Sequence, residues 1–250
     1  MSSEKIIYLG IVQINSGDFE KGIDSLYRAL ELNPNNREAY LNRGNGRYGL
    51  KDYSGAISDY DKAIEIDSYY FEAYGNRGSA KSNLNDFAGA ISDYSKVIEI
   101  KPYDFRAYCN RGNVKQDLKD YSGAISDLDK AIEITPNDHK LYNNRAYIKE
   151  EVNDLQGALY DYKKAVELDP NSETINLNIG CLKCKLKHYK GAIDHFNKAI
   201  EINASSPDGF HNRGLGKFQL GNTEDACKDW KKAAELGDAD SAKLVQEHCE

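Results

Sequence analysis

Apolar residues recur along this chain with helical spacing, in short stretches separated by turn-forming residues. In one such stretch they fall on a single side of a helix while polar residues fall on the other: Ala56, Ile57, Tyr60, Ala63 and Ile64. The pattern predicts an amphipathic helix.

A second helix is expected ahead of each amphipathic stretch. In the same part of the chain it carries Tyr40, Gly44 and Leu50, and the turn formers at 51–55 separate the two helices. Proline stops the second helix of four such units, at Pro34, Pro102, Pro136 and Pro170. The chain is therefore predicted to be all-α and to form a stack of helical hairpins.

The hairpins repeat with a fixed period of 34 residues. The predicted frames are 3-36, 37-70, 71-104, 105-138, 139-172, 173-206 and 207-240, and residues 241-250 are expected to form a C-terminal capping helix. Such a cap gives the last repeat a polar outer face, which repeat arrays need.

Small and bulky residues alternate at fixed positions of the repeat. Position 8 is small in every copy: Gly10, Gly44, Gly78, Gly112, Ala146, Gly180 and Gly214. Position 24 is bulky: Leu26, Tyr60, Tyr94, Leu128, Tyr162, Phe196 and Trp230. Alanine dominates positions 20 and 27. Large residues are therefore expected to pack against small ones between the two helices of a hairpin.

These positions resemble the tetratricopeptide repeat (TPR) family, whose unit is a helix-turn-helix of the same length. The resemblance covers residues 3 to about 240 and implies a right-handed α-solenoid of seven hairpins. Cations stand at position 11, where the family usually has tyrosine: Arg47, Lys81, Lys115, Lys149, Lys183 and Lys217. This difference is not expected to change the fold.

Charged residues at positions 7 and 23 come and go together. Arginine at position 7 accompanies aspartate at position 23 in five repeats: Arg43/Asp59, Arg77/Asp93, Arg111/Asp127, Arg145/Asp161 and Arg213/Asp229. Where Leu9 and Ile179 replace the arginine, the acid is absent too. We predict a salt bridge between the two helices of each of these hairpins, with a structural role.

The overall charge narrows the choice of partner. A formal net charge of -7 and a pI near 5.4 disfavour nucleic acid and anionic membranes, because both attract positive surfaces. No stretch has the length needed for membrane insertion. The five cysteines follow no framework spacing, so they are expected to be reduced thiols in a cytoplasmic protein.

The TPR resemblance implies that the first helices of successive repeats line a concave groove, with position 6 facing it. That position is asparagine in six consecutive repeats: Asn42, Asn76, Asn110, Asn144, Asn178 and Asn212. A side-chain amide can both donate to and accept from a peptide backbone, so such a ladder would hold an extended chain. It resembles the asparagine ladder of the O-linked N-acetylglucosamine transferase superhelix. The alternative is that each amide bonds within its own repeat.

Further groove positions are expected to set selectivity: Asn45, Asn113, Arg106 and Lys140. An acidic group on the ligand is expected near Arg106 and Lys140. A dicarboxylate clamp of the kind found in chaperone-binding co-chaperones is a lesser alternative. Leu41 and Asn110 stand where that clamp has cations.

The predicted function is a non-catalytic scaffold that binds an extended peptide or a partner protein, with no cofactor. One alternative is a self-associating assembly protein that forms a homo-oligomer through its apolar N-terminal helix, unless an upstream segment covers that helix. Another is a metal site at Cys181, Cys184 and His188, with His211 in reach. A lone C-x-x-C is weak evidence for metal, and no nucleophile has a credible base beside it.

Overall fold

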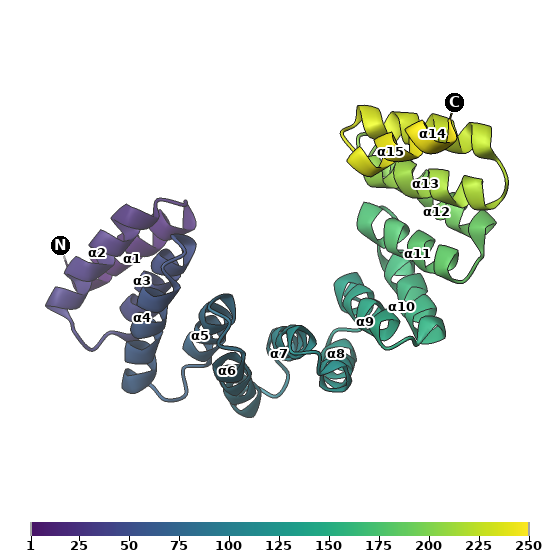
Figure 1. Cartoon of the computed structure of the whole chain (residues 1–250). Helices are drawn as coiled ribbons and strands as arrows, with labels where there is room; N and C mark the ends of the chain where they lie inside the picture. Colours follow the sequence, from purple (N-terminus) through teal and green to yellow (C-terminus); the bar gives the residue numbers. More distant parts are fainter. Residues whose placement is uncertain (1, 250) are drawn as a thin grey trace. The chain divides into compact units, whose positions relative to one another are not determined.

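The computed structural model describes residues 2–249, and every regular element in that range is an α-helix (Figure 1). The fifteen helices are α1 (Ser3–Asn15), α2 (Phe19–Leu32), α3 (Arg37–Gly49), α4 (Tyr53–Ile66), α5 (Phe71–Asn83), α6 (Phe87–Ile100), α7 (Phe105–Asp117), α8 (Tyr121–Ile134), α9 (His139–Glu151), α10 (Leu155–Leu168), α11 (Glu173–Lys185), α12 (Tyr189–Ile202), α13 (Pro207–Gln219), α14 (Thr223–Glu235) and α15 (Ala239–His248).

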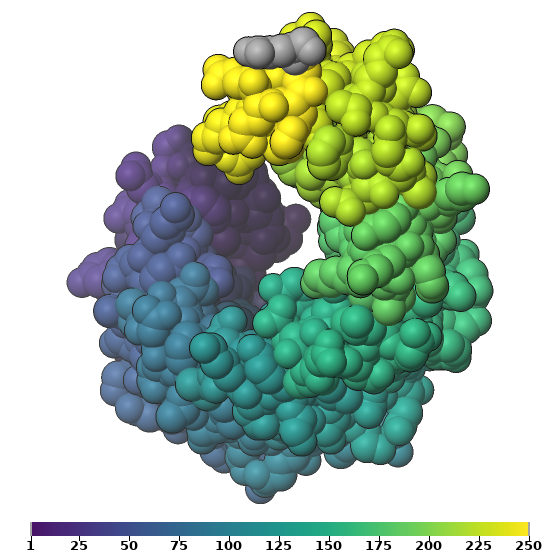
Figure 2. All heavy atoms as spheres, turned by 45° about the vertical axis from the view of Figure 1, so that its right-hand side comes forward, coloured from purple at the N-terminus to yellow at the C-terminus, as the bar shows by residue number. Residues whose placement is uncertain are grey.

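The chain divides into two compact units, Met1–Thr135 with α1–α8 and Pro136–Glu250 with α9–α15. Within each unit, helices pair into antiparallel hairpins, and the second helix of one hairpin packs on the first helix of the next. In the first unit the hairpins lie directly against one another, in order along the sequence (Figure 2). The predicted all-α stack of hairpins is confirmed.

A tight turn joins the two helices of each hairpin. Its central residue has a positive φ in every repeat: Gly17, Lys51, Asn85, Lys119, Asn153, Lys187 and Gly221. In four hairpins an aspartate follows and caps the second helix; Asp52, for instance, accepts a hydrogen bond from the Gly55 amide at 2.9 Å. A Cβ on Gly55 would lie 2.1 Å from that carboxylate, so the glycine makes room for the cap.

The core of each hairpin follows the predicted alternation of size. Tyr60, Phe196 and Trp230 are at most 1% exposed. A Cβ on the position-8 glycine opposite would come within 2.6 Å of the Tyr60 ring at Gly44. The same is true of Gly180 against Phe196 and of Gly214 against Trp230. Glycine at position 8 therefore sets the distance between the paired helices.

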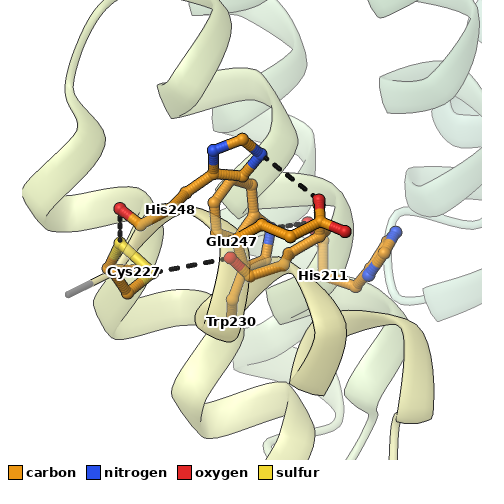
Figure 3. Close-up of a disulfide and its surroundings, with 7 residues drawn as sticks. His211, Cys227, Trp230, Glu247 and His248 are labelled. Carbon is orange, nitrogen blue, oxygen red and sulfur yellow. Dashed lines mark hydrogen bonds and ion pairs between the residues drawn. A yellow bond between two sulfur atoms is a disulfide. The ribbon is translucent and has the colours of Figure 1, made fainter.

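The C-terminal helix α15 packs on α14 and is tied to it by a disulfide between Cys227 and Cys249 (Figure 3). The expectation that all five cysteines are reduced was wrong for this pair. The two residues are 22 positions apart, but Gly237 reverses the chain and α15 returns along α14, which brings the two Cα atoms within 5.5 Å. Disulfides persist in oxidising surroundings, so the thiol argument for a cytoplasmic location no longer holds.

Candidate peptide-binding groove

Buried ion pairs hold the two helices of five hairpins together, as predicted. Asp93 on α6 is 4% exposed and accepts hydrogen bonds from Arg77 on α5, with Nη2–Oδ1 at 2.6 Å and Nε–Oδ2 at 2.9 Å. Equivalent two-point pairs join the other four predicted couples: Arg43/Asp59, Arg111/Asp127, Arg145/Asp161 and Arg213/Asp229.

The cations at position 11 are second partners of the same aspartates. The sequence pattern predicted only the position-7 arginines as partners. Lys81 Nζ lies 2.9 Å from the second carboxylate oxygen of Asp93. The same bridge is made by Arg47 to Asp59, Lys115 to Asp127, Lys149 to Asp161 and Lys217 to Asp229. The departure from the family pattern is therefore part of a three-residue ion cluster.

The position-7 arginine also reaches back to the preceding hairpin. Arg77 Nη1 donates to Asp61 Oδ1 at 2.6 Å, and Arg111 donates to Ser95 Oγ at 2.8 Å. Burial disfavours the charged form of Arg77, but its hydrogen bonds to Asp93 and Asp61 outweigh that and raise its pKa above the usual value. The cluster thus fixes both the hairpin and its stacking on its neighbour.

The sixth repeat lacks the arginine and the aspartate of the cluster and keeps only its cation, Lys183. His195 stands in place of the aspartate, and its Nδ1 lies 3.2 Å from Asn176 Oδ1. Burial, and secondarily the nearby charge of Lys183, lower the pKa of His195 to about 4. A neutral ring suits a repeat that lacks the arginine.

A concave strip runs across α3, α5 and α7 in the first unit. One pocket of about 230 Å³ is lined by Asn45, Tyr48, Tyr60, Asn76 and Ser79. A second pocket, of about 320 Å³, shares Asn45, Asn76 and Ser79 with the first. It is also lined by Leu41, Phe71, Glu72, Gly75, Tyr94, Val97, Asp104, Arg106, Ala107 and Asn110. We call the two pockets together the α3–α5–α7 groove.

Asparagine side chains line this groove, and two of them are hydrogen-bonded to each other. Asn45 Oδ1 accepts from Asn76 Nδ2 at 2.8 Å and from the Tyr60 hydroxyl at 3.0 Å. Within residues 2–249 the carbonyl oxygen of Asn76 and the whole amide of Asn110 have no hydrogen-bond partner. These groups are available to a ligand.

The other ladder positions differ in their bonding. Asn42 and Asn212 donate to the backbone oxygen four residues earlier, at 2.8 and 2.9 Å, which is the local bonding of the alternative interpretation. Asn178 donates to Asn143 Oδ1 at 3.0 Å within the second unit, where Asn144 is half-buried. The six amides are therefore not equivalent.

The cationic groove positions lie in surroundings that the sequence did not predict. Arg106 is exposed and shares its pocket with Glu72 and Asp104, so the pocket wall carries an excess of negative charge. Asn113 is exposed on α7, and Lys140 is exposed on α9 in the second unit. The wall does not favour an acidic ligand beside Arg106.

The five positions of the clamp alternative do line the second pocket together. Asn45, Asn76 and Arg106 are present there, but Leu41 and Asn110 supply no charge. The pocket therefore brings the five clamp positions together but lacks two of the cations with which such a clamp binds a dicarboxylate.

The metal alternative finds no support in the described part of the chain. Residues 2–249 contain no group of three metal-ligating side chains. His211 instead contacts Asp238 and Ser241, with Nδ1 at 2.9 and 2.8 Å. Burial raises the pKa of Cys181 to about 11, which disfavours the reactive thiolate.

Within residues 2–249, no helix has the length and apolar character to cross a membrane.

Solved structures share this architecture. A tetratricopeptide repeat protein from Parabacteroides merdae is 19% identical, with a TM-score of 0.71 over 99% of both chains. PilF of Pseudomonas aeruginosa is 18% identical, with a TM-score of 0.70 over 84% of this chain and 97% of its own. YrrB, described as a TPR protein with an unusual peptide-binding site, is 23% identical, with a TM-score of 0.63 over 75% of this chain and 97% of its own. These likenesses show the fold.

The fold and the repeated positions define a tetratricopeptide repeat protein. A tetratricopeptide repeat model matches residues 174–206, and the model of the ETO1 C-terminal domain matches residues 4–181. Because the second match spans most of the sequence, the chain belongs to the ETO1 C-terminal domain family. A search of curated proteins gave no significant match.

Proposed function

We propose that the protein is a non-catalytic scaffold that binds an extended peptide segment of a partner protein in the α3–α5–α7 groove. The observation that carries the proposal is the row of amides at Asn45, Asn76 and Asn110 on three successive first helices. An extended peptide presents alternating N–H and C=O groups, and amides can pair with both regardless of the peptide's sequence.

The free hydrogen-bonding capacity of the groove supports this. Asn76 is already oriented by its bond to Asn45, so little side-chain entropy is lost when its carbonyl oxygen accepts from a ligand. Tyr60 and Tyr94 are nearly buried and hold Asn45 and Ser79 in place through their hydroxyls, at 3.0 Å each. Buried tyrosine side chains therefore hold the polar groups of the groove in position.

The test is a positional-scanning library of nonapeptides, followed by fluorescence anisotropy with a selected sequence. Asn76→Ala combined with Asn110→Ala should weaken binding about thirty-fold, from the loss of two hydrogen bonds of about 1 kcal/mol each. The control, Asn42→Ala combined with Asn212→Ala, alters the same repeat position where the amide bonds its own helix, and should bind normally. Equal effects of the two pairs would refute the proposal.

A second candidate is self-association through α1. Its Ile6, Ile7 and Ile14 are buried, but Tyr8, Leu9 and Val12 are 70%, 42% and 45% exposed. Leu9→Glu with Val12→Glu would abolish any concentration-dependent rise in mass measured by light scattering. A mass that is constant with concentration in the unaltered protein would reject this candidate.

A further inference from the structure

Gly75 on α5 is an unusual glycine because nothing in the fold requires it. It lies inside a helix, where glycine is less favourable than alanine. At every other glycine in the described helices an added Cβ would lie within 3.4 Å of a neighbouring atom. At Gly75 the nearest atom, Val97 Cγ2, would be 3.9 Å away, which is an ordinary van der Waals distance.

The space left by the missing side chain opens into the groove. Gly75 lines the second pocket beside Asn76, and the apolar residues Leu41, Phe71 and Val97 line the same pocket. At the equivalent position of neighbouring repeats the chain carries side chains, such as Leu41 one repeat earlier. Gly75 therefore keeps an apolar bay open next to the amides.

We propose that this bay is the specificity subsite of the groove and takes one medium-sized apolar side chain of the peptide, next to a Lys or Arg residue. The inference rests on the proposed peptide-binding function. The apolar walls favour the side chain by the area that it buries. The basic neighbour follows from charge, because two carboxylates, Glu72 and Asp104, and one cation, Arg106, line the pocket itself.

Two substitutions at Gly75 separate an effect on stability from an effect on binding. Gly75→Ala removes a helix-weakening glycine without a clash and should raise Tm by about 2 °C. Gly75→Leu places in the bay the side chain that Leu41 has one repeat earlier. It should keep the helicity and lower the affinity about tenfold. A substitution that preserves the fold and weakens binding is the mark of a residue retained for a ligand.

The experiment uses fluorescein-labelled nonapeptides that differ at one residue, Leu, Met, Gly or Asp, next to an invariant Lys. The unaltered full chain should prefer the Leu or Met peptide over the Gly and Asp peptides by about tenfold. Gly75→Leu should abolish that preference. Glu72→Gln, which keeps the shape of an exposed side chain, should weaken all four Lys peptides and should have no effect on matched peptides with Gln in place of Lys. Gly75→Met answers the same question if Gly75→Leu lowers helicity.

Equal binding of the Leu and Gly peptides, or an unchanged preference in Gly75→Leu, would overturn the inference. If Asn76→Ala with Asn110→Ala still weakened binding in that case, peptide binding in the groove would be supported and only the subsite at Gly75 would be rejected. If neither the asparagine pair nor Gly75→Leu changed binding, or if no peptide bound at about 1 mM, the proposed function would fall with it.

Discussion

The carboxylate of Asp93 should be among the most costly charges to remove from the first unit. It is 4% exposed and bridges Arg77 and Lys81, whose side chains are only 17% and 19% exposed. Asp93→Asn would leave two half-buried cations close together. Breaking a buried ion pair costs about 3 to 5 kcal/mol, and because Arg77 keeps its bond to Asp61 we expect about 3 kcal/mol.

Asp61→Asn is the matched control because it removes the same charge from the same arginine. Asp61 is 46% exposed, so its pair with Arg77 should contribute less than about 1 kcal/mol. Repeat arrays can unfold in parts, so the assay is native-state hydrogen exchange of the α5 and α6 amides, supported by urea unfolding. Equal losses in the two variants, or a loss below about 1 kcal/mol in Asp93→Asn, would refute the reasoning.

Three further predictions concern other parts of the chain. Reduction of Cys227–Cys249 with dithiothreitol should destabilise the α14–α15 pair by about 3 kcal/mol, seen as faster hydrogen exchange in α15; unchanged exchange would contradict it. His195 titrates at about 4 in the folded chain and near 6.5 when unfolded, so its stabilisation is complete above pH 6.5 and declines as the pH falls towards 4. Allowing for its partial exposure this amounts to about 1 kcal/mol, and His195→Gln should flatten that part of the urea stability–pH profile. Gly44→Ala would force a Cβ to 2.6 Å from the buried Tyr60 ring and should cost about 1 to 3 kcal/mol in urea unfolding, whereas a neutral effect would mean that the ring can move.

The features that recur from one hairpin to the next could be predicted from the sequence. The alternation of Gly44 with Tyr60 and the pairing of Arg77 with Asp93 recur in copy after copy, so comparison within the chain exposed them. The lysine at position 11 recurs as well, but it varies with arginine and persists in the sixth repeat without an aspartate, so its partner was not evident.

The features that occur once could not be predicted in this way. The Cys227–Cys249 disulfide depends on how α15 folds back on α14, and no spacing rule contains that return. The bay at Gly75 depends on the space between α5 and the side chains packed near it, which the repeat pattern does not specify. The roles of the asparagines as ligand-binding groups remain predictions.

Nuclear magnetic resonance of the side-chain amides tests the central claim most directly, because it observes the proposed contacts themselves. The Nδ2 resonances of Asn45, Asn76 and Asn110 would be followed during titration with a nonapeptide selected from the library. We expect saturable shifts for these three and none for Asn42 and Asn212, whose amides bond their own helices. Binding that left the three groove amides unshifted would contradict it.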